Sequence, residues 1–156
     1  MPEYIIVHTP EEYSAAAKLF TEYAAWLNID LSFQHFESEL KELSQMYAAP
    51  TGGIILCKED ENYIACVAIR KIDTETAELK RMYVQSDKQG KGIGKTILTQ
   101  AIEMARGCGY QRIRLDTLDH MTAAINLYKH AGFKLIQAYY HNPIASALYF
   151  ELDITR

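Results

Sequence analysis

The stretch from residue 77 to residue 118 constrains the fold most, because its pattern changes from strand to loop to helix and back to strand. Ala77–Gln85 intersperses apolar residues among polar ones as a strand does, and Ser86–Gly94 has the composition of a loop. An amphipathic helix follows and ends near Gly107, and Gln111–Leu118 alternates like a half-exposed strand. A strand–helix–strand unit within one sheet forms a right-handed parallel crossover. This unit predicts a fold of the α/β type.

The flanking segments add further strands and helices to this unit. Thr9, Pro10 and Glu12 have the spacing of a capping box with proline at the first helical position, which predicts the start of a helix. Apolar residues at helical spacing predict a second helix over residues 33–47, stopped by Pro50. The other expected elements are strands at Tyr4–Val7, Gly53–Cys57, Tyr63–Ile69, Phe133–Tyr140 and Ala147–Asp153, and a short helix at Thr122–Ala131. Residues 1–156 are therefore expected to form one domain, a mixed α/β sheet in three layers.

Composition argues against several classes of protein. No apolar run approaches the ~18 residues that a membrane span needs. The three cysteines lack CxxC spacing, so we expect no metal site and no disulfide framework, and we expect the chain in the cytoplasm. The net charge of −4 argues against general nucleic-acid binding. Residues 1–75 carry 13 acidic and five basic residues, whereas residues 76–156 carry seven and 11. A basic second half suits a local polyanion, and an acidic first half favours a cationic co-substrate.

The loop Gln89–Thr96, with sequence Gln-Gly-Lys-Gly-Ile-Gly-Lys-Thr, carries the most specific chemistry. Its glycines let successive main-chain N–H groups turn inward, and the following helix start adds unpaired N–H groups and a partial positive charge. Such a loop binds phosphate or pyrophosphate. The plainer interpretation is a turn that only connects two elements. The three glycines and two lysines of the loop favour a phosphate site over this interpretation.

Glycine spacing separates the possible phosphate ligands. A nucleotide P-loop needs a glycine where this chain has Gln89, and a GxGxxG dinucleotide motif that starts at Gly92 needs one at Ile97. The pattern that does fit is Q/R-x-x-G-x-G/A, met by Gln89, Gly92 and Gly94.

This pattern resembles the cofactor motif of the GNAT superfamily of acetyl-CoA-dependent N-acetyltransferases. The resemblance covers most of the chain: Ala77–Val84 resembles the family's strand before the loop, and Ala124–Phe133, which ends in Gly-Phe, resembles its fourth helix. It implies a three-layer α/β (α+β) fold whose central mixed, mostly antiparallel sheet of about seven strands is flanked by four helices. It also implies acetyl-CoA as co-substrate, no metal, and a possible homodimer.

By the same resemblance, the residues before and within the loop bind the cofactor. Main-chain groups of the third strand, one of them in a local β-bulge, are expected along the pantetheine arm and at the thioester carbonyl, and the loop is expected around the pyrophosphate. The cofactor-binding residues are thus expected to be Met82, Tyr83, Val84, Gln89, Gly90, Lys91, Gly92, Ile93, Gly94, Lys95 and Thr96.

Two side chains are candidates for catalysis. Tyr128 occupies the family's tyrosine position, where the hydroxyl protonates the departing thiolate; the alternative is a tyrosine that only packs. Glu78 lies eleven residues before Gln89, the offset of a catalytic glutamate in the histone-acetylating branch; the alternative is an ion pair with a neighbouring Lys or Arg. Reserve candidates for the base are His120, His141, Tyr139 and Tyr140. The family's asparagine position is Met121 here, and Asn126 is the nearest replacement.

These features together predict direct acetyl transfer to a primary amine of a small molecule or peptide, with a main-chain N–H stabilising the oxyanion. The expected contacts of that amine are the first two helices and residues 141–143. A non-catalytic acyl-CoA-binding or sensing module on the same fold is the alternative, and a nucleotide-binding protein is a third class that the glycine spacing disfavours.

Overall fold

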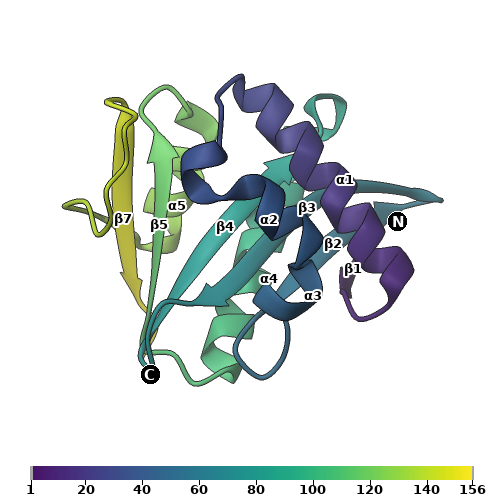
Figure 1. Cartoon of the computed structure of the whole chain (residues 1–156), viewed down its shortest axis with the longest axis horizontal. Coiled ribbons are helices and arrows are strands. Elements are labelled where there is room, and N and C mark those ends of the chain that lie inside the picture. The colour runs from purple at the N-terminus through teal and green to yellow at the C-terminus, as the bar shows by residue number, and fades with distance from the viewer. Residues whose placement is uncertain (1, 156) are drawn as a thin grey trace.

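A computed structural model describes residues 2–155, which form one seven-stranded sheet with helices on both faces (Figure 1). The single domain expected over residues 1–156 includes Met1 and Arg156, which lie outside the described residues. The strands are β1 (Glu3–Ile6), β2 (Gly53–Glu59), β3 (Asn62–Lys71), β4 (Thr76–Val84), β5 (Arg112–Leu118), β6 (Lys134–Ile136) and β7 (Ala147–Asp153). The helices are α1 (Pro10–Leu27), α2 (Phe36–Lys41), α3 (Leu43–Met46), α4 (Ile93–Gly107) and α5 (Thr122–Ala131), with 3₁₀ turns η1 (Ser32–Gln34) and η2 (Ser86–Lys88).

The sheet order is β1-β2-β3-β4-β5-β7-β6, and β4–β5 is the parallel pair among antiparallel neighbours. Helices α1, α2 and α3 cover the face turned to the viewer in Figure 1, and α4 and α5 lie behind the sheet. Each face has its own core: residues of α4 pack with Leu79 and Ile113, and residues of α1 pack with Leu56 and Tyr83. The expected three-layer, mostly antiparallel sheet and the parallel crossover from residue 77 to residue 118 are confirmed.

The central strands separate as they run toward their carboxyl ends. The β4–β5 pairing covers only Thr76–Glu78 against Arg112–Arg114, although β4 continues to Val84 and β5 to Leu118. Figure 1 shows the two strands diverging from the end where they are paired. The sheet therefore opens between its middle strands, with α1 on one side of the opening and α5 on the other.

Local sequence chemistry accounts for the helix boundaries. The Thr9 hydroxyl accepts from the Glu12 N–H at 3.2 Å, and the Glu12 carboxylate accepts from the Thr9 N–H at 3.1 Å, so the capping box is confirmed. Helix α5 ends at Gly132 with φ of 105°, a left-handed conformation that glycine adopts at little cost.

Two of the expected elements differ from the structure. The helix expected over residues 33–47 is broken into η1, α2 and α3, because His35 is left-handed (φ 58°) and Glu42 leaves the helical region (φ −122°). The break lets Gln34 and Glu39 reach Arg81 from two different segments. The strand expected at Phe133–Tyr140 shortens to β6, because its continuation turns inward as a loop.

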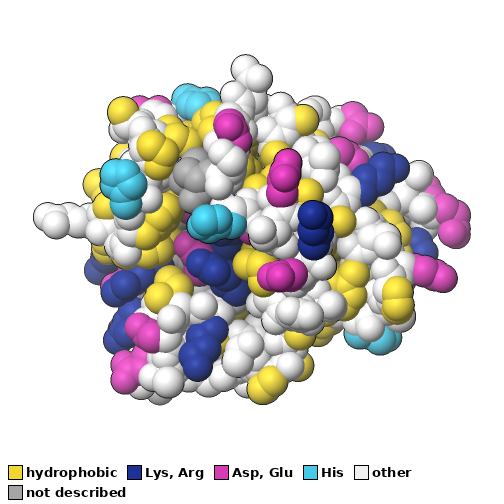
Figure 2. All heavy atoms as spheres, in the orientation of Figure 1, with side chains coloured by type: hydrophobic (Ala, Val, Ile, Leu, Met, Phe, Trp, Pro, Cys, Tyr) yellow, Lys and Arg dark blue, Asp and Glu magenta, His cyan; other side chains and the backbone are white. Residues whose placement is uncertain are grey.

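The surface over α1 and α2 carries acidic and basic side chains intermingled (Figure 2). Within residues 2–155, every helix is too short or too polar to cross a bilayer. The same residues contain no cluster of three His, Cys, Asp or Glu side chains that could hold a metal ion.

Candidate active site

The glycine loop is an open cradle of main-chain donors. Gly90 and Gly92 have φ of 80° and 83°, and a Cβ added at either would meet no atom within 4 Å. None of the main-chain N–H groups from Gln89 to Lys95 donates a hydrogen bond to another described residue; the first one used is that of Thr96, which donates to the Gly92 carbonyl. Such N–H groups at a helix start form an anion site. The linked phosphates of a coenzyme are the kind of ligand that this cradle fits.

A groove of about 610 Å³ runs from this cradle between β4 and α5. Trp26 of α1 and His120–Ala124, which lead into α5, form its other walls. Of the residues expected to bind a cofactor, those lining this groove are Met82, Tyr83, Val84, Gln89, Gly90, Gly92, Gly94 and Lys95. The other three, Lys91, Ile93 and Thr96, do not line it: the Ile93 side chain is buried in the core, and the Thr96 hydroxyl donates to the Gly92 carbonyl.

A β-bulge interrupts β4 beside the groove. Cys66 pairs with Tyr83 and Ala68 with Lys80, so Arg81 and Met82 together oppose one residue of β3. Arg81 is left-handed, with φ of 57°. A bulge leaves ladder groups unpaired and re-aims the side chains that follow. The bulge expected in this strand is therefore present.

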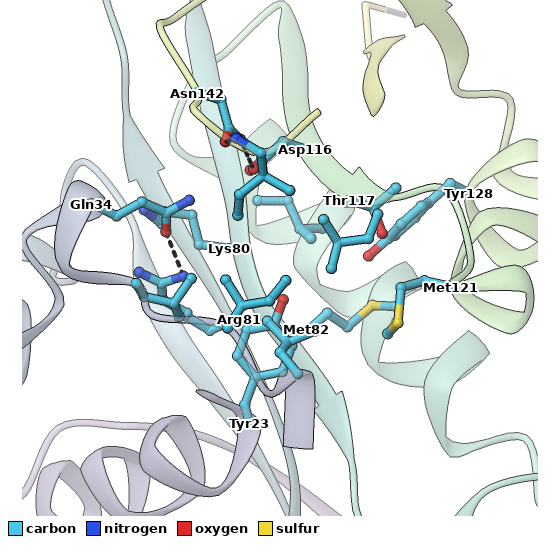
Figure 3. Close-up of a pocket in the computed structure, with 16 residues that line it drawn as sticks. Tyr23, Gln34, Lys80, Arg81, Met82, Asp116, Thr117, Met121, Tyr128 and Asn142 are labelled. Atoms are coloured by element: carbon cyan, nitrogen blue, oxygen red, sulfur yellow. Dashed lines mark hydrogen bonds between the residues drawn. The ribbon is translucent and has the colours of Figure 1, made fainter. Parts of the chain in front are cut away.

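A smaller cavity of about 50 Å³ lies in the opening between β4 and β5. Met82 and Met121 line both this cavity and the groove, so the two spaces meet at these side chains. Figure 3 shows Gln34, Lys80 and Arg81 on one side of the cavity and Tyr128 and Met121 on another. Its polar lining side chains are Tyr23, Gln34, Lys80, Arg81, Asp116, Thr117, Tyr128 and Asn142.

Tyr128 projects from α5 into this cavity (Figure 3). Its ring packs against Phe133 and Phe150 at centroid distances of 5.6 and 6.4 Å, and the residue is only 5% exposed. Its hydroxyl makes no hydrogen bond to the described residues. Burial, followed by the charges of Tyr23 and Asp116, raises the pKa of Tyr128 above its ordinary value. The hydroxyl therefore stays protonated and is free to donate a hydrogen bond or a proton.

Asp116, at the carboxyl end of β5, is a functional candidate that sequence reasoning missed. Its Oδ2 accepts from the Tyr140 hydroxyl at 2.7 Å, and that hydroxyl also accepts from Asn142 Nδ2 at 3.0 Å. Burial raises the pKa of Asp116; the Tyr140 hydrogen bond opposes the rise and the charge of Glu78 adds to it. A polar residue at the carboxyl end of a strand, where a parallel pair separates, is the signal that could have found it.

A hydrogen-bonded chain joins the bulge to Asp116 across the cavity. Arg81 Nη1 donates to Gln34 Oε1 at 2.8 Å, and Gln34 Nε2 donates to the Tyr140 hydroxyl at 3.1 Å. Arg81 also forms a two-pronged pair with Glu39, through Nε and Nη2 at 2.9 Å each. Arg81 and Asp116, on opposite walls, are therefore held in position by one network.

Glu78 lies outside both spaces, since neither the groove nor the small cavity has it in its lining. It is 3% exposed, and both of its oxygens are engaged: Oε1 accepts from Arg70 Nε at 2.8 Å and Oε2 from the Tyr139 hydroxyl at 2.7 Å. Its charge reaches the cavity through its effect on Asp116.

The structure separates the remaining candidates. His120 lines the groove with its side chain 64% exposed, and Tyr140 contacts Asp116, whereas His141 lines neither space. Asn126 is exposed and lines a different groove, between α5 and β6. Asn126 therefore does not replace the family's asparagine. At that position the chain has Met121, whose apolar side chain lines the small cavity.

A donor-lined loop at a helix start, beside a sheet that opens between its parallel strands, gives an α/β fold with an anion-binding arrangement at the opening. The model of the acetyltransferase (GNAT) family matches residues 20–133, and the chain belongs to this family.

Individual relatives agree with this assignment. An uncharacterized N-acetyltransferase of Schizosaccharomyces pombe is 34% identical over 153 residues, covering 96% of this chain and 93% of that protein. Among solved structures, an acetyltransferase from Streptococcus agalactiae superposes with a TM-score of 0.79 at 21% identity, over 97% of this chain and 98% of that one. A GNAT acetyltransferase from Elizabethkingia anophelis with acetyl-CoA bound gives 0.67 at 20% identity, over 97% of each chain. These two likenesses establish the fold.

Proposed function

We propose that this protein is an N-acetyltransferase that moves the acetyl group of acetyl-CoA to a primary amine of a small molecule or peptide. The observation that carries the proposal is the meeting of two spaces at Met82 and Met121. One is a groove that ends in unpaired main-chain donors, and the other is a cavity lined by a free hydroxyl and a carboxylate. The similar structure from E. anophelis, which holds acetyl-CoA, supports the choice of co-substrate.

The residues of the loop would bind the coenzyme chiefly through the main chain. The N–H groups of Gly90, Gly92 and Gly94 are available for the pyrophosphate, and the start of α4 adds its partial positive charge. Acetyl-CoA supplies the acetyl group as an activated thioester. The bulge at Arg81 and Met82 leaves main-chain N–H groups beside the meeting point, where one can polarise the thioester carbonyl.

The acceptor needs a base, because an alkyl amine with a pKa near ~10.4 is almost wholly protonated at neutral pH. Asp116 is placed for this role, since it lines the cavity and its pKa is raised toward the working range. Glu78 then contributes indirectly: its charge raises the pKa of Asp116, and its hydrogen bond positions Tyr139.

Tyr128 completes the proposed reaction. The neutral amine forms a C–N bond to the acetyl carbon, and the C–S bond breaks. Asp116 takes the proton whose loss from the ammonium form gives this neutral amine and releases it to solvent, and it then takes the second proton that the nitrogen loses as the amide forms. The Tyr128 hydroxyl protonates the departing thiolate and recovers its proton from solvent, and Asp116 releases its own to solvent. The products are an N-acetyl amine and free CoA.

A thiol-release assay with acetyl-CoA tests the proposal across amino acids, polyamines, aminoglycosides and peptides. Turnover with at least one amine is expected, together with calorimetric binding of CoA but not of ATP. Binding of CoA without turnover on any amine would support the non-catalytic acyl-CoA module instead, and binding of ATP alone would remove the coenzyme assignment.

A further inference from the structure

The bulge in β4 turns two consecutive basic side chains onto the same face of the sheet. Before the bulge, Leu79 packs in the core under α4; after it, Met82 packs there while Tyr83 joins the core under α1. Strict alternation would place Arg81 with Leu79, but Arg81 instead pairs with Glu39 of α2. Lys80 also approaches Glu39, at 3.9 Å. The extra residue thus doubles the positive charge at the wall of the small cavity.

The Lys80 side chain is buried there and has no hydrogen bond to any part of the chain that the structure describes. This side chain is 8% exposed, and its one ion pair with a residue that the structure describes is the long contact of 3.9 Å to Glu39 Oε1. That oxygen is already bonded by Arg81 Nη2 at 2.9 Å. Among the described residues, Lys80 Nζ donates no hydrogen bond. A buried ammonium group is normally paired and hydrogen-bonded, because leaving water costs it much free energy. Lys80 therefore has unused donors at the cavity.

The charges on this side of the cavity do not balance. On the α2 side, Lys80 and Arg81 carry two positive charges against the one negative charge of Glu39. Glu78, which also acts on Lys80, is paired with Arg70, and Asp116 lies on the opposite wall of the cavity. Burial, and then the charge of Arg81, lowers the pKa of Lys80, against the opposing effects of Glu78 and Glu39. When Asp116 faces a cationic group of the ligand, one further anionic group beside Lys80 balances the remaining charge, and a singly charged carboxylate matches it.

The opposite wall suits an amine. Asp116 Oδ2 is bonded by Tyr140 and approached by Asn142 Nδ2 at 3.5 Å, while no described group bonds Oδ1. The cavity between Asp116 and Lys80 holds only about 50 Å³, so a ligand that meets both walls is small and carries opposite charges a few bonds apart (Figure 3).

We propose that the acceptor is a carboxylate-bearing amine of the free amino-acid type, with its carboxylate bound by Lys80 beside Arg81 and its amine directed to Asp116. This inference rests on the proposed acetyl transfer and specifies its substrate class. It replaces the cationic co-substrate expected from the acidic first half of the sequence. Lys80 acts as the residue that determines specificity and takes no part in the chemistry.

The test measures CoA release with the proteinogenic amino acids. Each acceptor that is found is compared with its carboxamide and with its decarboxylated amine. For an acceptor with two carboxylates, each carboxylate is amidated separately. Wild-type protein is expected to prefer the carboxylate form in kcat/KM by at least about 30-fold, since a buried charge left unpaired costs that much or more. Lys80→Met should raise KM for the amino acid by a similar factor and lose the preference for carboxylate over carboxamide. Its kcat, measured at a pH above the acid limb of its own profile, and its calorimetric affinity for acetyl-CoA should stay within about twofold.

Lys41→Met is the matched control, because Lys41 is an exposed lysine of α2 that lines neither space. It should leave both the KM and the preference unchanged. Equal or faster acetylation of carboxylate-free amines by the wild type overturns the inference and leaves the acetyltransferase proposal standing. An undiminished preference in Lys80→Met overturns the role of that residue. Absence of turnover on any amine, charged or not, removes the proposed function and this inference together.

Discussion

The groove and the small cavity meet at Met82 and Met121, yet they are built from different parts of the chain. The anion end of the groove is made of main-chain N–H groups from one continuous loop. The cavity is made of side chains from α1, η1, β4, β5, α5 and the loop before β7. Main-chain recognition depends on backbone conformation, whereas side-chain recognition depends on the identity of each residue. Under the proposed function, the coenzyme would be recognised by backbone conformation and the acceptor by the chemistry of individual side chains.

This contrast has a consequence for substitutions. In the loop, only changes that alter φ or fill the open space should matter, because side chains there make few contacts. In the cavity, a change of one functional group should alter rate or specificity while the backbone stays the same. The following substitutions test the contrast, beginning with the largest expected effect.

Gly92→Val should abolish CoA binding. Valine at a φ of 83° costs on the order of 1–3 kcal/mol in backbone strain, and its side chain enters the space that the phosphates would use. Gly109→Val is the matched control, because Gly109 has a φ of 91° and equally open surroundings at the other end of α4. Calorimetry should show both proteins destabilised and only Gly92→Val without CoA binding. Equal CoA affinity in the two variants would contradict the loop assignment.

Tyr128→Phe should lower kcat by roughly 1,000-fold, within the range for a lost general acid. The ring contacts with Phe133 and Phe150 are retained, so calorimetric CoA affinity should change little. Tyr63→Phe on β3, outside both spaces, should leave kcat unaltered. Unchanged turnover in Tyr128→Phe would remove its assigned role.

Asp116→Asn should lower kcat/KM by about 100-fold near neutral pH and remove the acid limb of its pH profile. In the wild type, activity should fall as pH decreases through a pKa above the ordinary Asp value, because the protonated carboxyl cannot accept the amine proton. Burial and the charge of Glu78 raise the pKa of Asp116 and so move this limb to higher pH. The Tyr140 hydrogen bond and the charges of Lys80 and Arg81 lower the pKa and move the limb to lower pH.

Asp119→Asn provides the comparison for this profile, since Asp119 is 60% exposed and lines neither space. Its pH profile should match the wild type. An acid limb that persists in Asp116→Asn would assign the proton acceptor elsewhere.

Glu78→Gln should have a smaller effect on the reaction and a measurable one on stability. The amide keeps the shape of the side chain but removes the charge that pairs with Arg70, so we expect a loss of about 1–2 kcal/mol in the free energy of unfolding. The acid limb should also move to lower pH, because the Glu78 charge raises the pKa of Asp116. Denaturant titration and the pH profile check the two effects. A loss of activity as large as in Asp116→Asn would identify Glu78 as the base.

Thr9→Ala should affect neither ligand. Loss of the capping hydroxyl costs about 1 kcal/mol of stability, and the box lies at the start of α1, away from both spaces. Thermal unfolding should detect the change, and kcat/KM measured well below the transition should equal that of the wild type. A change in CoA affinity would show that the capping box of α1 is coupled to the groove, which contradicts the separation of these two regions.

The sequence predicts the groove far better than the cavity. The glycines, the helix start and the Gln89 spacing are contiguous, so one stretch of residues specifies the loop and its donors. The capping box and the order of most helices and strands along the chain were likewise predictable from local patterns. The bulge was expected only in general terms, since the left-handed Arg81 depends on its pairing with Glu39, a residue 42 positions earlier.

The cavity could not be predicted from the sequence, because its residues depend on contacts between segments that are far apart along the chain. Asp116 acquires its environment from Tyr140 and Asn142, and Lys80 acquires its burial from α2, none of which is close in sequence. The helix expected over residues 33–47 is broken at His35, and that break places Gln34 between Arg81 and Tyr140. Tertiary contacts here override local helical preference.

The single inserted residue in β4 also decides which later positions of the strand face α4 and which face α1. Odd-numbered positions such as Ala77 and Leu79 enter the α4 side before it, and even-numbered positions such as Met82 and Val84 do so after it. Removing one residue there would rotate every later side chain of the strand by half a turn and bring the wrong set against α4. Shortening or lengthening this strand by one residue would therefore disturb both cores at once, whereas replacing one of its side chains disturbs only the core that this side chain faces.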